Sequence, residues 1–417
     1  MTELTRIPKR IASTLINSLK GGVVPRVGLP YITVGRKNEI DALLHDVELV
    51  MDGGASFRFI MGRYGSGKSF MLQTIRNVCM DKGFVVMDAD LSPERRLTGT
   101  RGQGLATYSE LVANLATKTK PEGGALSLVL DRWAAGGERD LTHLSEMVHG
   151  YEFGKALNAY AAASAEGDDE MKARLLRWFR GEYPTKTEAK RDLGINVIIT
   201  DDDWYDYLKV FAAFLTGAGY CGMLILVDEL VNIYKIPNSV TRQANYEKLL
   251  TMYNDALSGK ARYLGIIMCG TPQCIEDNRR GIYSYEALRS RLDQGRFSGT
   301  YRDMLSPVIR LESLNAEEML VLVEKLTAIH AVLYGYEPTL DTEALADFIK
   351  TEFARIGADS LITPREVIRD FIEVLDILCQ NPGLSVGGLL GSDTFTFAKN
   401  EILSEETDPQ FAEFRLT

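Results

Sequence analysis

The feature that most constrains this chain is the eight-residue stretch from Gly62 to Ser69, Gly-Arg-Tyr-Gly-Ser-Gly-Lys-Ser. It matches the phosphate-binding loop pattern G-x-x-x-x-G-K-[ST] at every fixed position. Its glycines allow the backbone to curl so that successive N–H groups face one anion. Lys68 is expected to reach the β- and γ-phosphates of a nucleoside triphosphate, and Ser69 is expected to ligate Mg²⁺. The residues predicted to bind the nucleotide here are Gly62, Arg63, Tyr64, Gly65, Ser66, Gly67, Lys68, Ser69 and Phe70.

The segments on either side of this loop supply the context that the pattern requires. Residues 57–61 are short and apolar enough for a buried strand, and residues 70–76 continue as a helix. A helix N-terminus adds the positive end of its dipole to an anion site. The order strand, loop, helix therefore predicts a nucleotide-binding α/β fold and disfavours the alternative of a glycine-rich turn without a ligand.

A second segment, residues 222–229, predicts the other half of the site. Its apolar run is typical of a central parallel strand that is buried on both faces, and it ends in Asp228 and Glu229. In open α/β sheets, ligands bind at the carboxyl ends of the strands. We expect Asp228 to hold Mg²⁺ through water and Glu229 to orient and polarise the attacking water. The alternative is a strand that ends in two acids by chance.

Three polar residues farther along the chain are further candidates for the reaction. Thr271 ends the next apolar segment, where a hydroxyl can touch both the γ-phosphate and the attacking water; otherwise it is a simple strand-to-turn residue. Arg291 and, as second choice, Arg289 lie on a predicted helix end. From there an arginine can reach the nucleotide of a neighbouring subunit and neutralise transition-state charge. The alternative for either arginine is pairing with a local acid such as Asp293.

A last candidate, Arg365, lies at the predicted start of a helix. Thr363 is a suitable cap, proline suits the first helical position, and Glu366 completes a capping box. A cation at a helix N-terminus conflicts with the helix dipole, which suggests an external anion such as a γ-phosphate. The alternative is an ordinary surface arginine.

Composition limits the class of protein and its surroundings. No apolar run is long enough to span a membrane, and the first residues are not a secretory signal, so we expect a cytoplasmic protein with no membrane partner. The five cysteines and four histidines show no metal-ligand spacing, and the cysteines are predicted to be small buried residues. A net charge of −10 disfavours a protein coated in nucleic acid but allows a local basic surface.

The order of predicted elements divides the chain into four parts. Residues 1–32 form an N-terminal helix, expected over residues 4–19, and a linker. An α/β nucleotide-binding domain follows, with a helical insertion at about residues 95–216 between its second and third strands, which is far more than a plain connection needs. A helical lid and a glycine-rich, then acidic, tail complete the chain. The predicted bounds of these last three parts are residues 33–312, 313–380 and 381–417.

Taken together, the ordered motifs resemble AAA+ ATPases of the replication-initiator (origin-recognition) type. At finer grain the chain is similar to the ATP-binding proteins of bacterial BREX phage-defence systems, through residues 90–95, 227–234 and 362–366. The resemblance implies an AAA+ P-loop NTPase with a parallel central sheet and a C-terminal helical lid. The tail is too short for the winged helix of initiators, so origin-type sequence-specific DNA binding is not expected.

The resemblance also implies roles for the segment Val34-Gly35-Arg36, which with Glu39 matches V-G-R-x-x-E. In AAA+ proteins this segment lies along the adenine. The backbone at Val34 and Gly35 is then expected to bond the base edge, and Arg36 to serve the site or a neighbouring subunit. Without this context the same residues read as a turn that enters a surface helix.

Three hypotheses of function remain open. The favoured one is an ATP-hydrolysing, Mg²⁺-dependent homo-oligomer that acts on double-stranded DNA with a helicase or another defence protein. Its DNA contacts would come from Lys9, Arg10, Lys20 and the arginines between residues 279 and 302. The second is a nucleotide-dependent scaffold or sensor with little turnover. The third is a monomeric P-loop enzyme, such as a kinase, in which the arginines serve a bound substrate.

Overall fold

The computed structural model describes residues 7–136, 140–293, 302–338, 340–356, 363–381 and 383–390. The chain divides into two compact units. Unit 1 comprises Met1–Lys37, Gly62–Thr74 and Leu311–Thr417, and unit 2 comprises Asn38–Met61 and Ile75–Arg310. The predicted tail from residue 391 onward and one arginine of the basic stretch, Arg296, lie outside the described residues.

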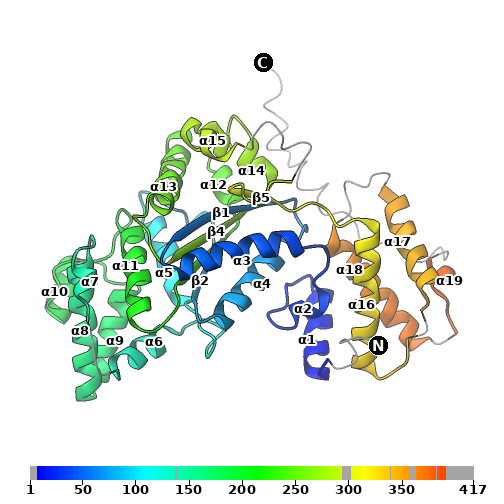
Figure 1. Ribbon diagram of the computed structural model, residues 1–417, viewed down its shortest axis with the longest axis horizontal. Coiled ribbons are helices and arrows are strands. Elements are labelled where there is room, and N and C mark those ends of the chain that lie inside the picture. Colours follow the sequence, from blue (N-terminus) through cyan, green and yellow to red (C-terminus); the bar gives the residue numbers. More distant parts are fainter. Residues whose placement is uncertain are drawn as a thin grey trace. The chain divides into compact units, whose positions relative to one another are not determined.

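Unit 2 is built on a five-stranded sheet in the order β2-β3-β4-β1-β5 (Figure 1). Every neighbouring pair is parallel. The predicted α/β fold with a parallel central sheet is therefore confirmed. The strands are β1 (Ala55–Met61), β2 (Val85–Asp90), β3 (Met223–Asp228), β4 (Leu264–Gly270) and β5 (Val308–Arg310).

The central strands are apolar because both of their faces are covered. All seven residues of β4 and the first five of β3 are buried. The register pairs Asp90 with Asp228 and Met61 with Gly270, so β2 and β3 end level with each other, as do β1 and β4. The loop that begins at Gly62 follows β1 directly, and Thr271 follows β4. Both segments thus leave the sheet at its carboxyl edge, where β3 also ends.

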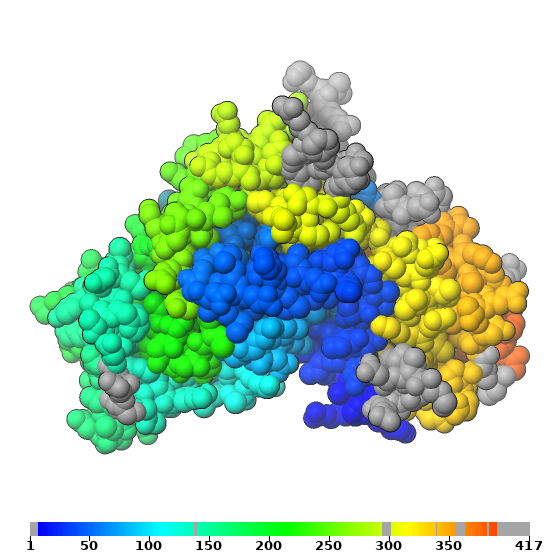
Figure 2. All heavy atoms as spheres, viewed as in Figure 1, coloured from blue at the N-terminus to red at the C-terminus, as the bar shows by residue number. Residues whose placement is uncertain are grey.

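Seven helices of the described chain lie between β2 and β3, in the stretch for which the sequence analysis predicts a helical insertion. They are α5 (Gln103–Ala113), α6 (Leu126–Ala134), α7 (Thr142–Ser145), α8 (Gly150–Glu166), α9 (Asp169–Phe179), α10 (Lys186–Leu193) and α11 (Trp204–Gly217). In Figure 2 these helices form the cyan-to-green group of atoms.

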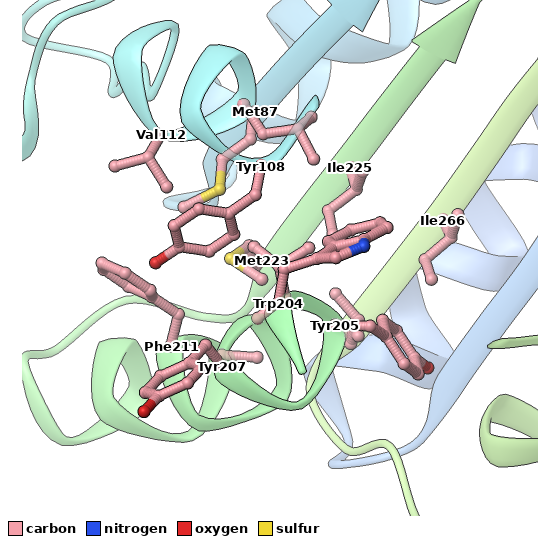
Figure 3. Close-up of a cluster of buried hydrophobic side chains, with 14 of the residues drawn as sticks. Met87, Tyr108, Val112, Trp204, Tyr205, Tyr207, Phe211, Met223, Ile225 and Ile266 are labelled. Carbon is pink, nitrogen blue, oxygen red and sulfur yellow. The ribbon is translucent and has the colours of Figure 1, made fainter. Parts of the chain in front are cut away.

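The insertion shares one core with the sheet. Tyr108 of α5 and Phe211 of α11 lie beside Met87 of β2 and Met223 of β3 (Figure 3). All four side chains are fully buried. Burial of side chains this large stabilises by about 2 kcal/mol each. The insertion is therefore an integral part of unit 2.

The remaining helices of unit 2 flank the sheet or follow its strands. They are α3 (Lys37–Met51), α4 (Lys68–Asp81), α12 (Val231–Tyr234), α13 (Ser239–Leu257), α14 (Pro272–Glu276) and α15 (Glu286–Leu292), with a short 3₁₀ helix at Ile282–Ser284. The first residue of α3 and the first turns of α4 belong to unit 1.

Unit 1 has its own hydrophobic core, which joins the N-terminal helix α1 to helices from the C-terminal part of the described chain. Leu15 and Ile16 of α1 are buried in one cluster with Leu326 of α16 and Phe371 of α18. The helix predicted over residues 4–19 thus packs with the C-terminal helices, although its first residues lie outside the described range. The helices of unit 1 are α1 (Lys9–Lys20), α2 (Leu29–Ile32), α16 (Ala316–Tyr334), α17 (Thr342–Ile356), α18 (Pro364–Gln380) and α19 (Val386–Leu390).

Within the described ranges, no helix combines the length and the apolar character that crossing a membrane requires.

Candidate functional site

The loop Gly62–Ser69 is curled, and its conformation explains why glycine stands at three of its positions. Gly65 and Gly67 have positive φ angles of 74° and 96°, which favour glycine. A Cβ at Gly65 would lie 2.7 Å from Oγ1 of Thr363, and a Cβ at Gly62 would lie 2.4 Å from Oγ of Ser66. Larger residues would therefore force the loop open.

The polar groups of the loop fit a phosphate ligand. Lys68, the first residue of α4, donates from Nζ to the carbonyl oxygens of Gly62 and Arg63, both at 3.0 Å. This places the ammonium group across the loop. The Oγ of Ser66 is buried without a hydrogen-bond partner in the described chain. A buried hydroxyl without a partner in a curled glycine loop at a helix N-terminus suits an anion.

Arg36 holds this loop from the N-terminal segment. Its Nη2 donates to the carbonyl oxygen of Ser66 at 3.1 Å and to that of Glu312 at 2.8 Å. The residue is only 6% exposed. These bonds tie the loop to the segment that enters α16, which gives Arg36 a positioning role on the loop backbone.

The residues next to Arg36 that are predicted to contact the base are packed within unit 1. Gly35 has a positive φ of 65°, and a Cβ there would lie 2.5 Å from Oε1 of Glu318. Val34 and Phe70 are partly buried and pack against the hydrophobic core of unit 1. Apolar side chains and backbone groups next to a phosphate loop can hold a planar base.

Arg365 lies beside the same loop. It follows the predicted capping box, in which the backbone N–H of Thr363 donates to Oε2 of Glu366 at 3.1 Å. Its guanidinium carbon is 5.8 Å from the centre of the Tyr64 ring. Unit 1 therefore brings together three parts of the chain that are far apart in the sequence: the segment 34–36, the loop with Phe70 after it, and Arg365.

In unit 2, the two predicted acids follow each other in an unusual backbone turn. Asp228 ends β3, and its Oδ1 accepts the backbone N–H of Glu229 at 2.8 Å. Glu229 has a positive φ of 62°, which is unfavourable for a residue with a side chain. Asn232 supports the turn, because its Nδ2 donates to the carbonyl oxygen of Leu91 at 2.8 Å. Strain of this kind is typical of functional sites.

The sequence reasoning missed Asp90 as a site residue. It ends β2 directly opposite Asp228 in the sheet register. Burial raises the pKa of the Asp90 carboxyl above its ordinary value, and the charges of Asp228 and Asp88 add to the rise. The signal was present as the alternating acids Asp88 and Asp90 at the end of a predicted strand.

Thr271 caps the short helix α14. Its Oγ1 accepts the backbone N–H of Cys274 at 3.4 Å. A hydroxyl that accepts one bond still has its own hydrogen to donate, so the cap is compatible with a contact to phosphate or water.

The two candidate arginines of α15 differ. Arg291 is engaged within the chain, since its Nε donates to Oδ1 of Asn254 at 3.1 Å and its Nη1 to the carbonyl oxygen of Ala287 at 2.6 Å. Arg289 is exposed, and its guanidinium makes no ion pair or hydrogen bond to the described residues. Arg289 is thus the more available of the two for a contact outside the chain.

Comparison with known proteins gives a family. The family model described as BREX system ATP-binding protein BrxC/D matches residues 7–139 and 135–394. No curated protein matches the chain. The family covers both BrxC and BrxD, so the predicted resemblance to the ATP-binding proteins of BREX systems, BrxD in particular, is confirmed at the level of this shared family.

Proposed function

Because the chain belongs to the BREX system ATP-binding protein BrxC/D family, we propose that it is a Mg²⁺-dependent AAA+ ATPase of anti-phage defence. The observation that carries this proposal is the curled loop Gly62–Ser69 at the end of β1, in a sheet whose β3 ends in Asp228 and Glu229. An order in which β4 separates these two strands is compatible with the AAA+ assignment. The division into a nucleotide-binding domain, a lid and a tail is part of the same proposal.

Binding would use the loop backbone and three polar side chains. Successive N–H groups of the loop and the ammonium of Lys68 would bind the phosphates. Ser69 and Asp228 would hold Mg²⁺, which neutralises phosphate charge when it is bound. Val34, Gly35 and Phe70 would hold the base, with Arg36 fixing the loop backbone.

Hydrolysis would depend on Glu229. Its carboxylate would polarise the attacking water, and Thr271 would help to orient that water. The left-handed backbone at Glu229 aims the side chain at the cost of local strain, which a purely structural residue does not need.

Two variants of Glu229 test this role together. Glu229→Gln should retain ATP binding and lower steady-state ATPase turnover by about 10²–10⁴-fold. Glu229→Gly should lose turnover similarly but raise the free energy of unfolding by about 1 kcal/mol, because glycine relieves the positive φ. Unchanged turnover in Glu229→Gln would show that Glu229 has no role in the reaction. Lower stability in Glu229→Gly would show that the backbone at Glu229 is not strained.

We further propose that the active oligomer completes its site with an arginine from the adjacent subunit. The engaged guanidinium of Arg291 favours Arg289 for this role. Such arginines are worth about 10³–10⁵ in rate in GTPases. Mass measurement with a non-hydrolysable ATP analogue tests assembly, and a persistent monomer with concentration-independent activity would support a monomeric P-loop enzyme instead.

Action on double-stranded DNA beside a helicase or another defence protein is the last part of the proposal. Lys9 and Arg10 are exposed at the start of α1, whereas Lys20 is bonded to Asp376 and is a weaker candidate. Binding to DNA with nucleotide present should weaken steeply as salt rises. Absence of binding at low salt would contradict this part alone.

A further inference from the structure

Two cations of the proposed phosphate site share one aromatic ring. The guanidinium carbon of Arg365 is 5.8 Å from the centre of the Tyr64 ring, and Nζ of Lys68 is 5.9 Å from it. A cation within about 6 Å of a ring centre is attracted to the face of the ring. Tyr64 occupies a variable position of the loop pattern, so the pattern itself gives this ring no function.

The guanidinium of Arg365 also lies where a side chain at Gly22, in the turn that ends α1, would be. Gly22 has a positive φ of 68°, and a Cβ there would lie 2.9 Å from Nη2 and 3.2 Å from Nε of Arg365. The turn is fixed by backbone bonds from Gly22 N to the Leu19 carbonyl at 3.0 Å and from Val23 N to the Ser18 carbonyl at 2.9 Å. The absence of a side chain at Gly22 is therefore what admits the guanidinium.

The turn cannot easily move away, because α1 is anchored in unit 1. Lys20, its last residue, forms an ion pair with Asp376 of α18. Leu15 and Ile16 are buried in the core of the same unit. Arg365 thus has an attractive ring at Tyr64 and, beside Gly22, a space that only a glycine leaves open.

We propose that Tyr64 and Gly22 are positioning residues for Arg365, so that α1 takes part in setting how Arg365 meets the γ-phosphate. This inference rests on the proposed ATP-binding function and adds to it the contact with the γ-phosphate that the sequence predicts for Arg365. Neither residue touches the reacting atoms. The ring draws the guanidinium toward the loop, and the absence of a side chain at Gly22 leaves room for it there.

Substitutions at Tyr64 test the ring. Tyr64→Leu should weaken binding of a fluorescent ATP analogue by about 2- to 5-fold, the strength of an exposed cation–ring contact. Tyr64→Phe keeps the ring and should bind as the wild type does. In an Arg365→Ala background, most of the effect of Tyr64→Leu should vanish, because the two residues act through one contact. Any part of the effect that remains in this background is due to the contact between Tyr64 and Lys68.

Two neighbouring glycines test the turn. Gly22→Ala should weaken ATP binding, and this loss should disappear in the Arg365→Ala background. Gly21→Ala is the matched control, because Gly21 has an ordinary φ of −74° and a Cβ there would meet atoms no closer than 3.4 Å. Thermal unfolding of each variant separates loss of folding from loss of binding.

Defined outcomes overturn the inference. If Tyr64→Leu and Tyr64→Phe weaken ATP binding equally, the aromatic ring does not position Arg365. If Gly21→Ala and Gly22→Ala weaken it equally, the turn at Gly22 does not position Arg365. Full persistence of either effect without Arg365 also contradicts it. If the wild type binds ATP and Arg365→Ala binds it equally well, this inference fails while the proposed function stands. If the wild type does not bind ATP, the proposed function itself fails.

Discussion

Two places in the molecule, one around the loop in unit 1 and one at the ends of β2 and β3 in unit 2, hold their charged groups in opposite ways. In unit 1, Arg36 is bonded to two carbonyl oxygens, and Asp376 is bonded to Lys20 and His330. In unit 2, Glu229 lies in a strained turn, and the charge of Asp228 adds to the rise in the pKa of Asp90. The difference indicates that hydrogen bonds and ion pairs hold the residues around the loop in place. The acids at the ends of β2 and β3, by contrast, are in an unfavourable arrangement that a bound cation can stabilise.

Among the substitutions that test this comparison, the largest effect is expected at Arg36. Arg36→Ala removes two charge-assisted bonds that hold the loop, which are worth about 1.5–3 kcal/mol. We expect ATP affinity to fall by about 10- to 100-fold in a titration with a fluorescent analogue, since the loop must then be ordered on binding. Arg36→Lys, which can keep one bond, should be intermediate. Unchanged affinity in Arg36→Ala would show that the loop is held without this residue.

The next effect concerns the stability of unit 1. Burial alone would raise the pKa of Asp376, but its bonds to Lys20 and His330 outweigh burial and hold that pKa below the ordinary value. An acid of this kind stabilises above its unfolded pKa, and the stabilisation is lost as pH falls through the folded pKa. Asp376→Ala should therefore lower the free energy of unfolding by about 2 kcal/mol at pH 7, and by less below about pH 4.

Asp347 is a matched control for this prediction. It lies in α17, and its pair with Lys350 is exposed on both sides. Asp347→Ala should change stability by less than about 0.5 kcal/mol. Equal losses of stability in Asp376→Ala and Asp347→Ala would contradict the distinction between an acid bonded to two partners and an acid in an exposed ion pair.

The smallest effect is expected at Asp90, where substitution should raise the free energy of unfolding instead of lowering it. The folded-state pKa of Asp90 is raised, so its contribution to stability is fully present below the unfolded pKa, near 3.8, and is lost as pH rises through the folded value. Asp90→Asn should therefore raise the free energy of unfolding at pH 7 by about 0.5 kcal/mol, because solvent screens a partly exposed group. Chemical denaturation at pH 7 and pH 3 measures the difference, which should vanish at the lower pH.

Asp88 offers the contrast within the same strand. It is paired with Arg76 at 3.1 Å. Asp88→Asn should lower stability at pH 7, where Asp90→Asn raises it. If both substitutions change stability in the same direction, the proposed difference between an acid paired with an arginine and an acid close to other acids is wrong.

Much of the fold could be predicted because it depends on local patterns. The apolar run before Asp228 forms a buried central strand, and the glycine pattern forms a curled loop between a strand and a helix. The predicted capping box at Thr363 is formed, since a cap involves residues only three positions apart. Fold class and the identity of the loop followed from such short-range rules.

Other features of the site could not be predicted, because they depend on partners far away in the chain. Arg36 bonds a carbonyl that is 276 residues distant, and Arg291 is engaged by Asn254. Asp90 became a candidate only when the strand register placed it opposite Asp228. Residue type alone does not say which arginine is engaged and which is available.

Local sequence patterns were enough to predict the chemistry that we propose for this protein: a glycine loop with a lysine for phosphate, and two acids at the end of an apolar strand. These patterns are sufficient because backbone curl and strand burial depend on residues within a few positions of each other. Only the tertiary structure decided which charged groups are satisfied and which are strained. Hydrogen-bond partners and pKa shifts arise from contacts between segments that the fold brings together.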